Sequence, residues 1–254
     1  MNAPKPKPSK EVDLMITCLC DTFYDQVAAS TVKVLEHVGC TVQVPEAQTC
    51  CGQPAFNAGD WKAARKVIQH TLKAFSSERT VVIPSGSCNH MVQHGYPLAF
   101  EESDDLEDVI SFAKRCWELA DYLVNGLGVK KWPGKFDGKI SLHRSCHTRG
   151  SDSYASAVQL LSSIEGLELL EFDESEQCCG FGGTFSVAYP NTSTSMGKLK
   201  IEKLTAVKPN YIGATDMACM LHMGGIASKE ETPFKVMHIA QILDQALQTK
   251  EAIA

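Results

Sequence analysis

Short apolar runs of strand length alternate along the chain with longer segments in which apolar residues recur at helical spacing. The runs of the first half lie at residues 13–17, 41–45 and 80–84. Helical spacing covers 23–38 and 60–75, with Asp60 placed to begin the second helix. Phe23 and Trp61 are among the residues expected to face inward. This alternation predicts a parallel, Rossmann-like sheet.

The second half of the chain repeats this order. Strand-like runs lie at 139–143, 167–172 and 211–214, and helical spacing covers 154–164, 192–207 and 236–247. The segment 238–243 also resembles 118–123. We therefore predict an α/β fold with two similar Rossmann-like parallel-sheet modules related by internal duplication. The predicted parts are a flexible tail (1–11), a first module (12–127), a linker (128–138) and a second module (139–254).

A run of acidic residues lies late in the first half. Six carboxylates occur between residues 101 and 108. We expect a long helix from about residue 105 to residue 127, and carboxylates are favoured near the start of a helix by its dipole. The run is therefore interpreted as the beginning of that helix and not as a metal site.

Composition narrows the class of protein. The chain has 254 residues, a formal net charge of −6, 44% hydrophobic residues and 21% charged residues, as in a globular protein. With this charge and no basic stripe, nucleic-acid binding is not expected. No signal peptide and no apolar stretch of about 18 residues is visible, so we predict no membrane span and a cytoplasmic location. In a reducing compartment, clustered cysteines are more often ligands or redox groups than disulfides.

The cysteines themselves repeat. Eight of the 11 fall into two sets of four with the spacings C-x31-C-C-G-x35-C and C-x31-C-C-G-x38-C. The first set is Cys18, Cys50, Cys51 and Cys88, and the second set is Cys146, Cys178, Cys179 and Cys219. Each cysteine-bearing loop follows a predicted strand, so we expect the thiols of a set to converge at the carboxyl edge of its sheet.

Converging thiols have several explanations. Disulfides are disfavoured by the compartment, and zinc sites usually use C-x2–4-C knuckles, which neither half contains. Inert buried cysteine explains single residues better than two matched sets. An iron–sulfur cluster fits best, because four thiolates are its usual ligands, and zinc or no metal remain the alternatives. Glycines beside the ligands, which allow close backbone approach to the cofactor, are Gly52, Gly180, Gly182 and Gly183.

The two Cys-Cys-Gly motifs resemble those of the cysteine-rich CCG domain family. Further matching segments are Thr17-Cys18, Gly86-Ser87-Cys88 and Val236-Met237-His238-Ile239-Ala240. The family includes the B subunit of heterodisulfide reductase and subunits of glycolate, glycerol-3-phosphate and some succinate oxidoreductases. Among its members, the chain is most similar to a small bacterial iron–sulfur subunit of an L-lactate-oxidising system. The resemblance covers the chain from about residue 13 to its end.

The chain departs from the heterodisulfide reductase subunit in one respect. There each repeat ends in C-x-x-C, whereas here Cys88 is followed by Met91 and Cys219 by His222 at the third position. The resemblance without the fifth thiol implies a four-thiolate [4Fe–4S] cluster in each half. His222 is a candidate fifth ligand or proton donor.

Other cysteines and basic residues stand near these motifs. Cys20 is interpreted as a bystander of the cluster, and Cys40 and Cys116 as core residues. Four basic residues surround Cys146 and are interpreted either as a lining that raises a cluster's potential or as surface charges; they are His143, Arg144, His147 and Arg149.

These features predict an electron-transfer subunit and not a complete enzyme. Gly180-Phe181-Gly182-Gly183 lacks the G-x-G-x-x-G spacing of a dinucleotide site. The resemblance implies oxidation of L-lactate to pyruvate by a complex with other iron–sulfur or flavin-type subunits, and a quinone as an acceptor. Two alternatives remain, namely a disulfide or quinone reductase and a zinc-stabilised interaction module.

Overall fold

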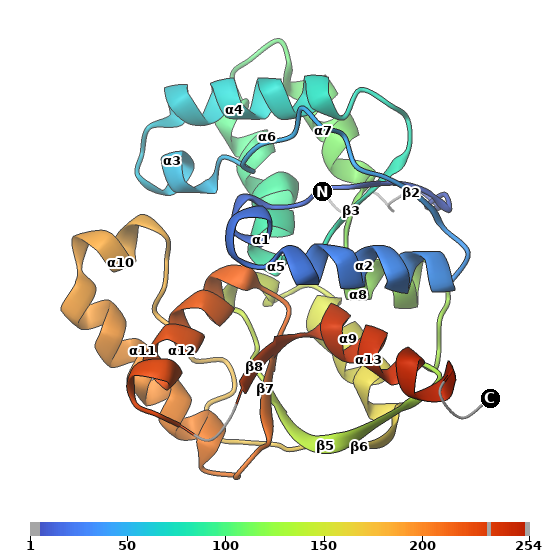
Figure 1. The fold of residues 1–254 in the computed structure, drawn as a ribbon. Helices are drawn as coiled ribbons and strands as arrows, with labels where there is room; N and C mark the ends of the chain where they lie inside the picture. The colour runs from blue at the N-terminus through green and yellow to red at the C-terminus, as the bar shows by residue number, and fades with distance from the viewer. Residues whose placement is uncertain (1–5, 233–234, 252–254) are drawn as a thin grey trace.

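A computed structural model of the chain describes residues 6–232 and 235–251. It contains two four-stranded sheets in which all neighbouring strands are parallel. The strand orders are β2-β1-β3-β4 and β6-β5-β7-β8, so the same topology occurs twice (Figure 1). The prediction of an α/β fold with two duplicated parallel-sheet modules is confirmed.

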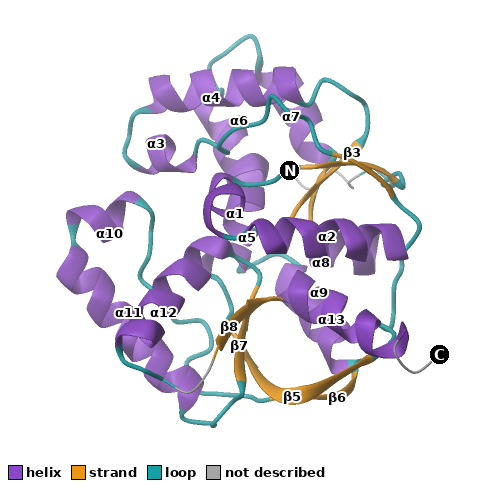
Figure 2. Ribbon diagram, in the orientation of Figure 1, coloured by secondary structure: helices purple, strands orange, loops and turns teal. Residues whose placement is uncertain are grey.

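The elements of each half follow the predicted order. The first half contains β1 (Glu11–Leu14), α1 (Cys18–Phe23), α2 (Asp25–His37), β2 (Thr41–Gln43), α3 (Gln53–Asn57), α4 (Trp61–Ala74), β3 (Thr80–Ile83), α5 (Gly86–His90), η1 (Met91–Gly95), α6 (Tyr96–Ala99), α7 (Leu106–Lys114), β4 (Cys116–Glu118), α8 (Leu119–Asp121) and η2 (Tyr122–Gly126). The second half contains β5 (Lys135–Leu142), η3 (Cys146–Thr148), α9 (Ser153–Ser162), β6 (Glu165–Leu169), α10 (Thr184–Ala188), α11 (Pro190–Thr205), β7 (Tyr211–Ala214), α12 (Met217–Lys229), β8 (Lys235–His238) and α13 (Ile239–Glu251). Figure 2 separates the strands from the helices that cover them.

Helix α4 begins as its sequence indicates. The Asp60 side chain accepts a hydrogen bond from the Ala63 N–H at 2.9 Å, which satisfies one of the free donors of the first turn. The inward orientation predicted for two aromatic residues is wrong, however. Phe23 is 59% exposed and Trp61 is 39% exposed, and Trp61 stacks on Phe56 at the surface. Phe23 is the last residue of α1 and so lies outside α2, which begins only at Asp25, whereas Trp61 is the first residue of α4. Both residues therefore stand at helix ends, where the helix leaves the core.

The long helix predicted for 105–127 is wrong. Helix α7 ends at Lys114, and the chain then forms β4, the fourth strand of the first sheet. All three residues of β4 are buried, and so are Leu119 and Ala120, which follow it in α8. A buried run of this kind has no exposed side chains that would distinguish strand spacing from helical spacing.

The same error affects the closing helix predicted at 236–247. Residues Lys235–His238 form β8 beside β7, and α13 begins only at Ile239. The resemblance of 118–123 to 238–243 therefore reflects an equivalent turn from the fourth strand into a helix. Glu118 accepts hydrogen bonds from the N–H groups of the helix that it precedes, and His238 accepts one through Nδ1.

The two halves share one cluster of buried apolar residues, and each half also has a cluster of its own. Helix α13 of the second half packs against α2 of the first half, and Figure 1 shows them side by side. One cluster of buried apolar residues contains side chains of both halves, among them Val34 and Leu243. At the same contact the Ser30 hydroxyl donates to the buried Asp244 carboxylate at 2.9 Å. Neither half buries all of its apolar surface alone.

The boundaries of the two halves are packed as well. Residues 1–5 of the predicted tail lie outside the described part, and β1 begins within that tail at Glu11. The Tyr122 hydroxyl donates to the Ser9 carbonyl at 2.7 Å. Strand β5 begins at Lys135, inside the predicted linker, and the Trp132 indole donates to the Leu243 carbonyl at 2.9 Å.

Among the described helices, none is long and apolar enough to cross a membrane.

Two linker glycines provide a matched test of this packing. Gly134 and Gly128 both have positive φ, but a Cβ at Gly134 would lie 2.0 Å from the Ala246 carbonyl oxygen of α13, whereas a Cβ at Gly128 meets nothing within 4 Å. We expect Gly128→Ala to cost about 1–2 kcal/mol of unfolding free energy through its backbone alone. Gly134→Ala should cost about 1–3 kcal/mol more, because α13 must move. Urea denaturation measures both, and equal losses would contradict a linker packed on α13.

Candidate metal centre

The cysteines of each set leave the carboxyl ends of three neighbouring strands. In the first half Cys18 begins α1 just after β1, the Cys50-Cys51 pair follows β2, and Cys88 lies in α5 after β3. The second half repeats this arrangement after β5, β6 and β7. Because β1 and β5 are each flanked by two parallel neighbours, the three loops of a half reach the same edge of the sheet.

One cavity of about 370 Å³ is lined by both sets. Its lining includes Cys18, Cys50, Cys51, Cys88, Cys146, Cys178, Cys179 and Cys219. All 11 cysteines of the chain have free thiols. The sequence predicted convergence within each half, and the structure adds that the two sets face a common space. Their assignment as ligands stays a prediction.

The first set contains a thiolate that the backbone stabilises. The Sγ atoms of Cys18 and Cys50 lie 3.6 Å apart, too far for a disulfide, and the Gly52 N–H donates to the Cys50 sulfur at 3.4 Å. The neighbouring thiols of Cys18 and Cys51 lower the pKa of Cys50 to about 3. The pKa of Cys18 is raised in turn, first by its hydrogen bond to Cys50. The pair therefore holds one proton, on Cys18.

The second set has the same arrangement. The Sγ atoms of Cys146 and Cys178 lie 3.8 Å apart, and the Gly180 N–H donates to the Cys178 sulfur at 3.3 Å. Hydrogen bonds from the thiols of Cys146 and Cys179 lower the pKa of Cys178 to about 2. The deeper pair, Cys179 and Cys219, is 3.2 Å apart between sulfurs. Each half thus presents one half-buried thiolate at the same position of its motif.

The predicted cofactor-binding glycines differ in their roles. Gly52 and Gly180 have φ near +84° and +89° and direct their N–H groups at a cysteine sulfur. A Cβ at Gly180 would lie 2.6 Å from the Ser193 carbonyl oxygen, so α11 leaves no room for a side chain there. Gly182 and Gly183 also have positive φ and line the cavity directly.

The two halves meet at the loops that carry the fourth cysteines. The Gly86 N–H donates to the Thr215 carbonyl at 3.1 Å, although the residues belong to different halves. The buried carboxylate of Asp216 accepts from the Ser87 N–H of α5 at 2.6 Å and from the Ala218 N–H of α12 at 3.0 Å. Asp216 therefore caps α12 and holds it against the first turn of α5, which contains Cys88. No sequence pattern had indicated the contact between the halves, because Ser87 lies 129 positions away from Asp216.

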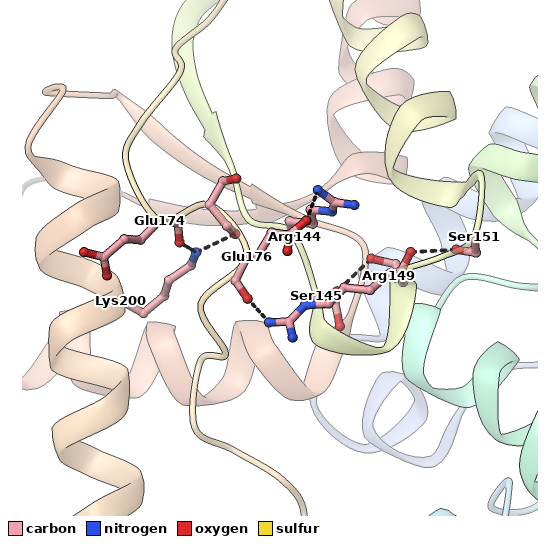
Figure 3. A network of polar contacts seen from close by, with 9 residues as sticks. Arg144, Ser145, Arg149, Ser151, Glu174, Glu176 and Lys200 are labelled. Atoms are coloured by element: carbon pink, nitrogen blue, oxygen red, sulfur yellow. Dashed lines mark hydrogen bonds and ion pairs between the residues drawn. The ribbon is translucent and has the colours of Figure 1, made fainter.

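Basic residues near Cys146 bind the loop that leads to Cys178 (Figure 3). Arg144 pairs with the Glu176 carboxylate at 2.5 Å, and Arg149 donates to the Glu176 backbone carbonyl. Lys200 of α11 donates to the carbonyls of Glu174 and Ser175. These residues fix the Cys178 loop from both sides. His147 lines the cavity beside Cys146, and its Nδ1 lies 3.5 Å from the Cys146 sulfur.

His143 is not a surface charge. It is 1% exposed, and one of its ring nitrogens and the sulfurs of Cys179 and Cys219 all lie within 4.8 Å of one another. Burial lowers the pKa of His143 to about 3, with the nearby Lys200 ammonium adding to the effect, so the ring is neutral. In the sequence His143 is one of four basic residues around Cys146, and nothing there indicated that it is the buried one.

The remaining candidates lie away from the cavity wall. The Cys20 thiol is buried in the core and donates to the Tyr24 carbonyl at 3.4 Å. Cys40 contacts the Tyr122 hydroxyl, and Cys116 donates to the Phe112 carbonyl. His222 bonds to Ser193 of α11 through Nε2 and is not part of the cavity lining. A direct role for His222 as a ligand thus gains no support from its position.

Comparison with known proteins identifies the family. A model of the cysteine-rich CCG domain matches residues 12–93 and 140–224, which together make up more than half of the chain. The chain belongs to the cysteine-rich CCG domain family. It contains two copies of the CCG domain, and each copy holds one set of four cysteines.

The chain is similar to several named proteins and to a solved structure. It is 39% identical over 93% of its length to a Bacillus cereus protein called "Lactate utilization protein A 2", of which 99% is covered. It is 40% identical over 92% of its length to "Lactate utilization protein A" of Oceanobacillus iheyensis, of which 96% is covered. A crystal structure of a hypothetical Helicobacter pylori protein has the same fold, with a TM-score of 0.62 and 14% identity; the alignment covers 96% of this chain and 50% of that one.

The thiolates can be tested by their reactivity in metal-free, reduced protein. The lowered pKa values of Cys50 and Cys178 keep both as thiolates at pH 6, whereas burial raises the pKa of Cys20 to about 12. We expect iodoacetamide at pH 6 to modify Cys50 and Cys178 first, at a rate that hardly changes between pH 5 and 8. Peptide mass spectrometry reads out each site. A rate that rises about tenfold per pH unit at these two residues would contradict the prediction.

The cross-half role of Asp216 can be compared with the ordinary cap at Asp60. Asp216→Ala removes a helix cap and leaves the buried Ser87 N–H without its acceptor, at a combined cost of about 2–4 kcal/mol. Asp60→Ala removes one exposed cap from α4 and should cost about 1 kcal/mol. Urea denaturation of the metal-free, reduced variants measures both free energies. An Asp216 variant no less stable than the Asp60 variant would disprove the cross-half contact.

Proposed function

We propose that this protein is an iron–sulfur electron-transfer subunit of an oxidoreductase complex that oxidises L-lactate to pyruvate. Each cysteine set would hold one [4Fe–4S] cluster. The observation that carries the proposal is the repeated constellation of four free thiols at one sheet edge, with both sets lining one cavity.

The donor atoms present fit such a cluster. Four sulfurs per set match the usual ligand count, and thiolate is the form that binds iron. In each set the neighbouring thiols, together with the Gly52 or Gly180 N–H group, lower the pKa of one cysteine and so favour its thiolate before metal binds. The same glycine N–H groups could later offset the negative charge of a cluster. Hard, oxygen-preferring cations have little to bind here, because among the described residues Asp216 is the one carboxylate of the cavity lining, and it already accepts from the Ser87 and Ala218 N–H groups.

A bound cluster supplies one-electron transfer, and the chain supplies its surroundings. Cys51, Cys88, Cys179 and Cys219 are buried, so the inner part of each site is shielded from water. Cys18, Cys50, Cys146 and Cys178 are half-buried and face the cavity. The Asp216 contact keeps the two sets in a fixed relation. Hydride or carbon chemistry would come from a partner subunit.

The substrate and the partners rest on relatives. The printed names of two relatives refer to lactate utilisation, and each is covered almost completely by the alignment. We accordingly propose partners that are iron–sulfur or flavin-type subunits of a lactate-oxidising complex, a quinone as a final acceptor, and a cytoplasmic location. Nucleic acid is not among the proposed partners.

The common cavity favours one second candidate. A volume of about 370 Å³ lies within the range of small-molecule sites, so a small disulfide or quinone could be reduced between the two sets. Turnover of such a substrate by the isolated protein, with an artificial electron donor, would favour this reductase over the electron-transfer subunit. A zinc-stabilised module would instead contain zinc and no acid-labile sulfide.

Anaerobic reconstitution tests the proposal. Two [4Fe–4S] clusters require about eight irons and eight sulfides per chain. Cys179→Ser should lose about half of both, because it removes a ligand of the second set only. Cys20→Ser is the matched control, since the Cys20 thiol bonds to Tyr24 outside the cavity, and it should keep the full content. Iron, sulfide and zinc analysis together with EPR reads out the result, and zinc without sulfide would refute the proposal.

A further inference from the structure

The two cysteine sets differ in one residue at an equivalent position. Met15 and His143 both stand directly after the central strand of their sheet, 128 positions apart like Cys18 and Cys146. The Met15 N–H donates to the Val82 carbonyl at 3.0 Å, and the His143 N–H donates to the carbonyl of Gly213, the matching residue of β7, at 2.8 Å. The second set therefore has an imidazole where the first set has a thioether.

The imidazole of His143 lacks a partner. Among the described residues, neither ring nitrogen forms a hydrogen bond, although the side chain is almost fully buried. An unsatisfied buried polar group of this kind costs about 1–3 kcal/mol. The sulfurs of Cys179 and Cys219 are the potential ligand atoms next to it. An imidazole ring carries at least one N–H group whether it is neutral or charged, and this group can donate a hydrogen bond to sulfur.

A buried lysine makes the same side of the cavity more positive. Lys200 has no exposed surface, lies over the Phe172 ring and donates to two backbone carbonyls. Within the described part of the chain, no carboxylate forms an ion pair with it. Burial lowers its pKa to about 8, while the thiols of the second set act in the opposite direction. Helix α4 is the counterpart of α11 in the first half, and the buried residues of the two helices have the same spacing. In this alignment Lys200 corresponds to Thr71, which carries no charge.

We propose that His143 donates an N–H hydrogen bond to a sulfur of the second site and, with Lys200, makes that site the stronger electron acceptor of the two. This inference rests on the proposed binding of iron–sulfur clusters. Hydrogen bonds to sulfur and nearby positive charge stabilise the reduced, more negative form and so raise a reduction potential. One electron then passes from the first site, which is oxidised, to the second site, which is reduced, without proton transfer or bond formation. Electrons therefore pass through the protein in one direction, from the half that contains Met15 to the half that contains His143.

The two sites can be measured separately. Cys51→Ser removes a ligand of the first set and leaves the second site, and Cys179→Ser does the converse. In the Cys51→Ser protein we expect His143→Met to lower the midpoint potential of the second site by at least about 59 mV, which is a tenfold change in a one-electron equilibrium. His143→Gln keeps an N–H donor, so its midpoint potential should differ by less than this amount from that of the protein with His143. In the Cys179→Ser protein, Met15→His should raise the potential of the first site.

EPR-monitored redox titration gives the potentials, and iron and sulfide analysis of each variant gives the cluster content. Unchanged potentials in both His143→Met and Met15→His overturn the inference. A strongly coupled nitrogen in pulsed EPR that disappears in His143→Met also overturns it, because His143 would then be a ligand and not a donor. Absence of iron and sulfide from the unmodified protein would instead refute the proposed function. If His143→Met loses its cluster, the Met15→His titration still decides the effect of the imidazole.

Discussion

The close approach of the two halves at Gly86 is the contact on which the geometry of the site depends. Its N–H group bonds to the Thr215 carbonyl, and a Cβ there would lie 2.5 Å from the Thr148 methyl group. The helices that start at this contact carry Cys88 and Cys219. Any larger residue at Gly86 would separate them. The absence of a side chain at one position thus determines how near the two sets of cysteines lie.

The same contact changes what the duplication means. Two copies of a parallel-sheet module could each present a cysteine edge to solvent. Here the shared core of α2 and α13 holds the halves on one side, and Asp216 joins them on the other. The two edges consequently face one cavity. Eight sulfurs lining one cavity form an environment that a single copy could not produce, with the two sets at equivalent positions of the two halves.

The sequence was sufficient for the features that recur locally. Spacing identified the two cysteine sets, and the alternation of strands and helices predicted the convergence of each set. Strand β4 could not be predicted, because Cys116–Glu118 is three residues long and wholly buried. The contact of Ser30 with Asp244 joins residues 214 positions apart, and no short-range pattern encodes it. The burial of His143 could not be predicted for a similar reason: it follows the central strand β5, so neighbours from distant parts of the chain cover it.

The pairing of thiols explains why the site can exist before it binds anything. Bringing several thiolates together in a buried space is unfavourable, since like charges repel and burial penalises the charged form. In each half this repulsion is reduced because the neighbouring thiol, Cys18 or Cys146, has a raised pKa and keeps its proton. The negative charge then lies on Cys50 or Cys178, beside a glycine N–H. A ligand that takes all four sulfurs must displace the protons, so its binding strengthens as pH rises. Because α2 and α13 pack the two halves together in a common cluster of apolar side chains, that binding energy stabilises the whole chain and not one half alone.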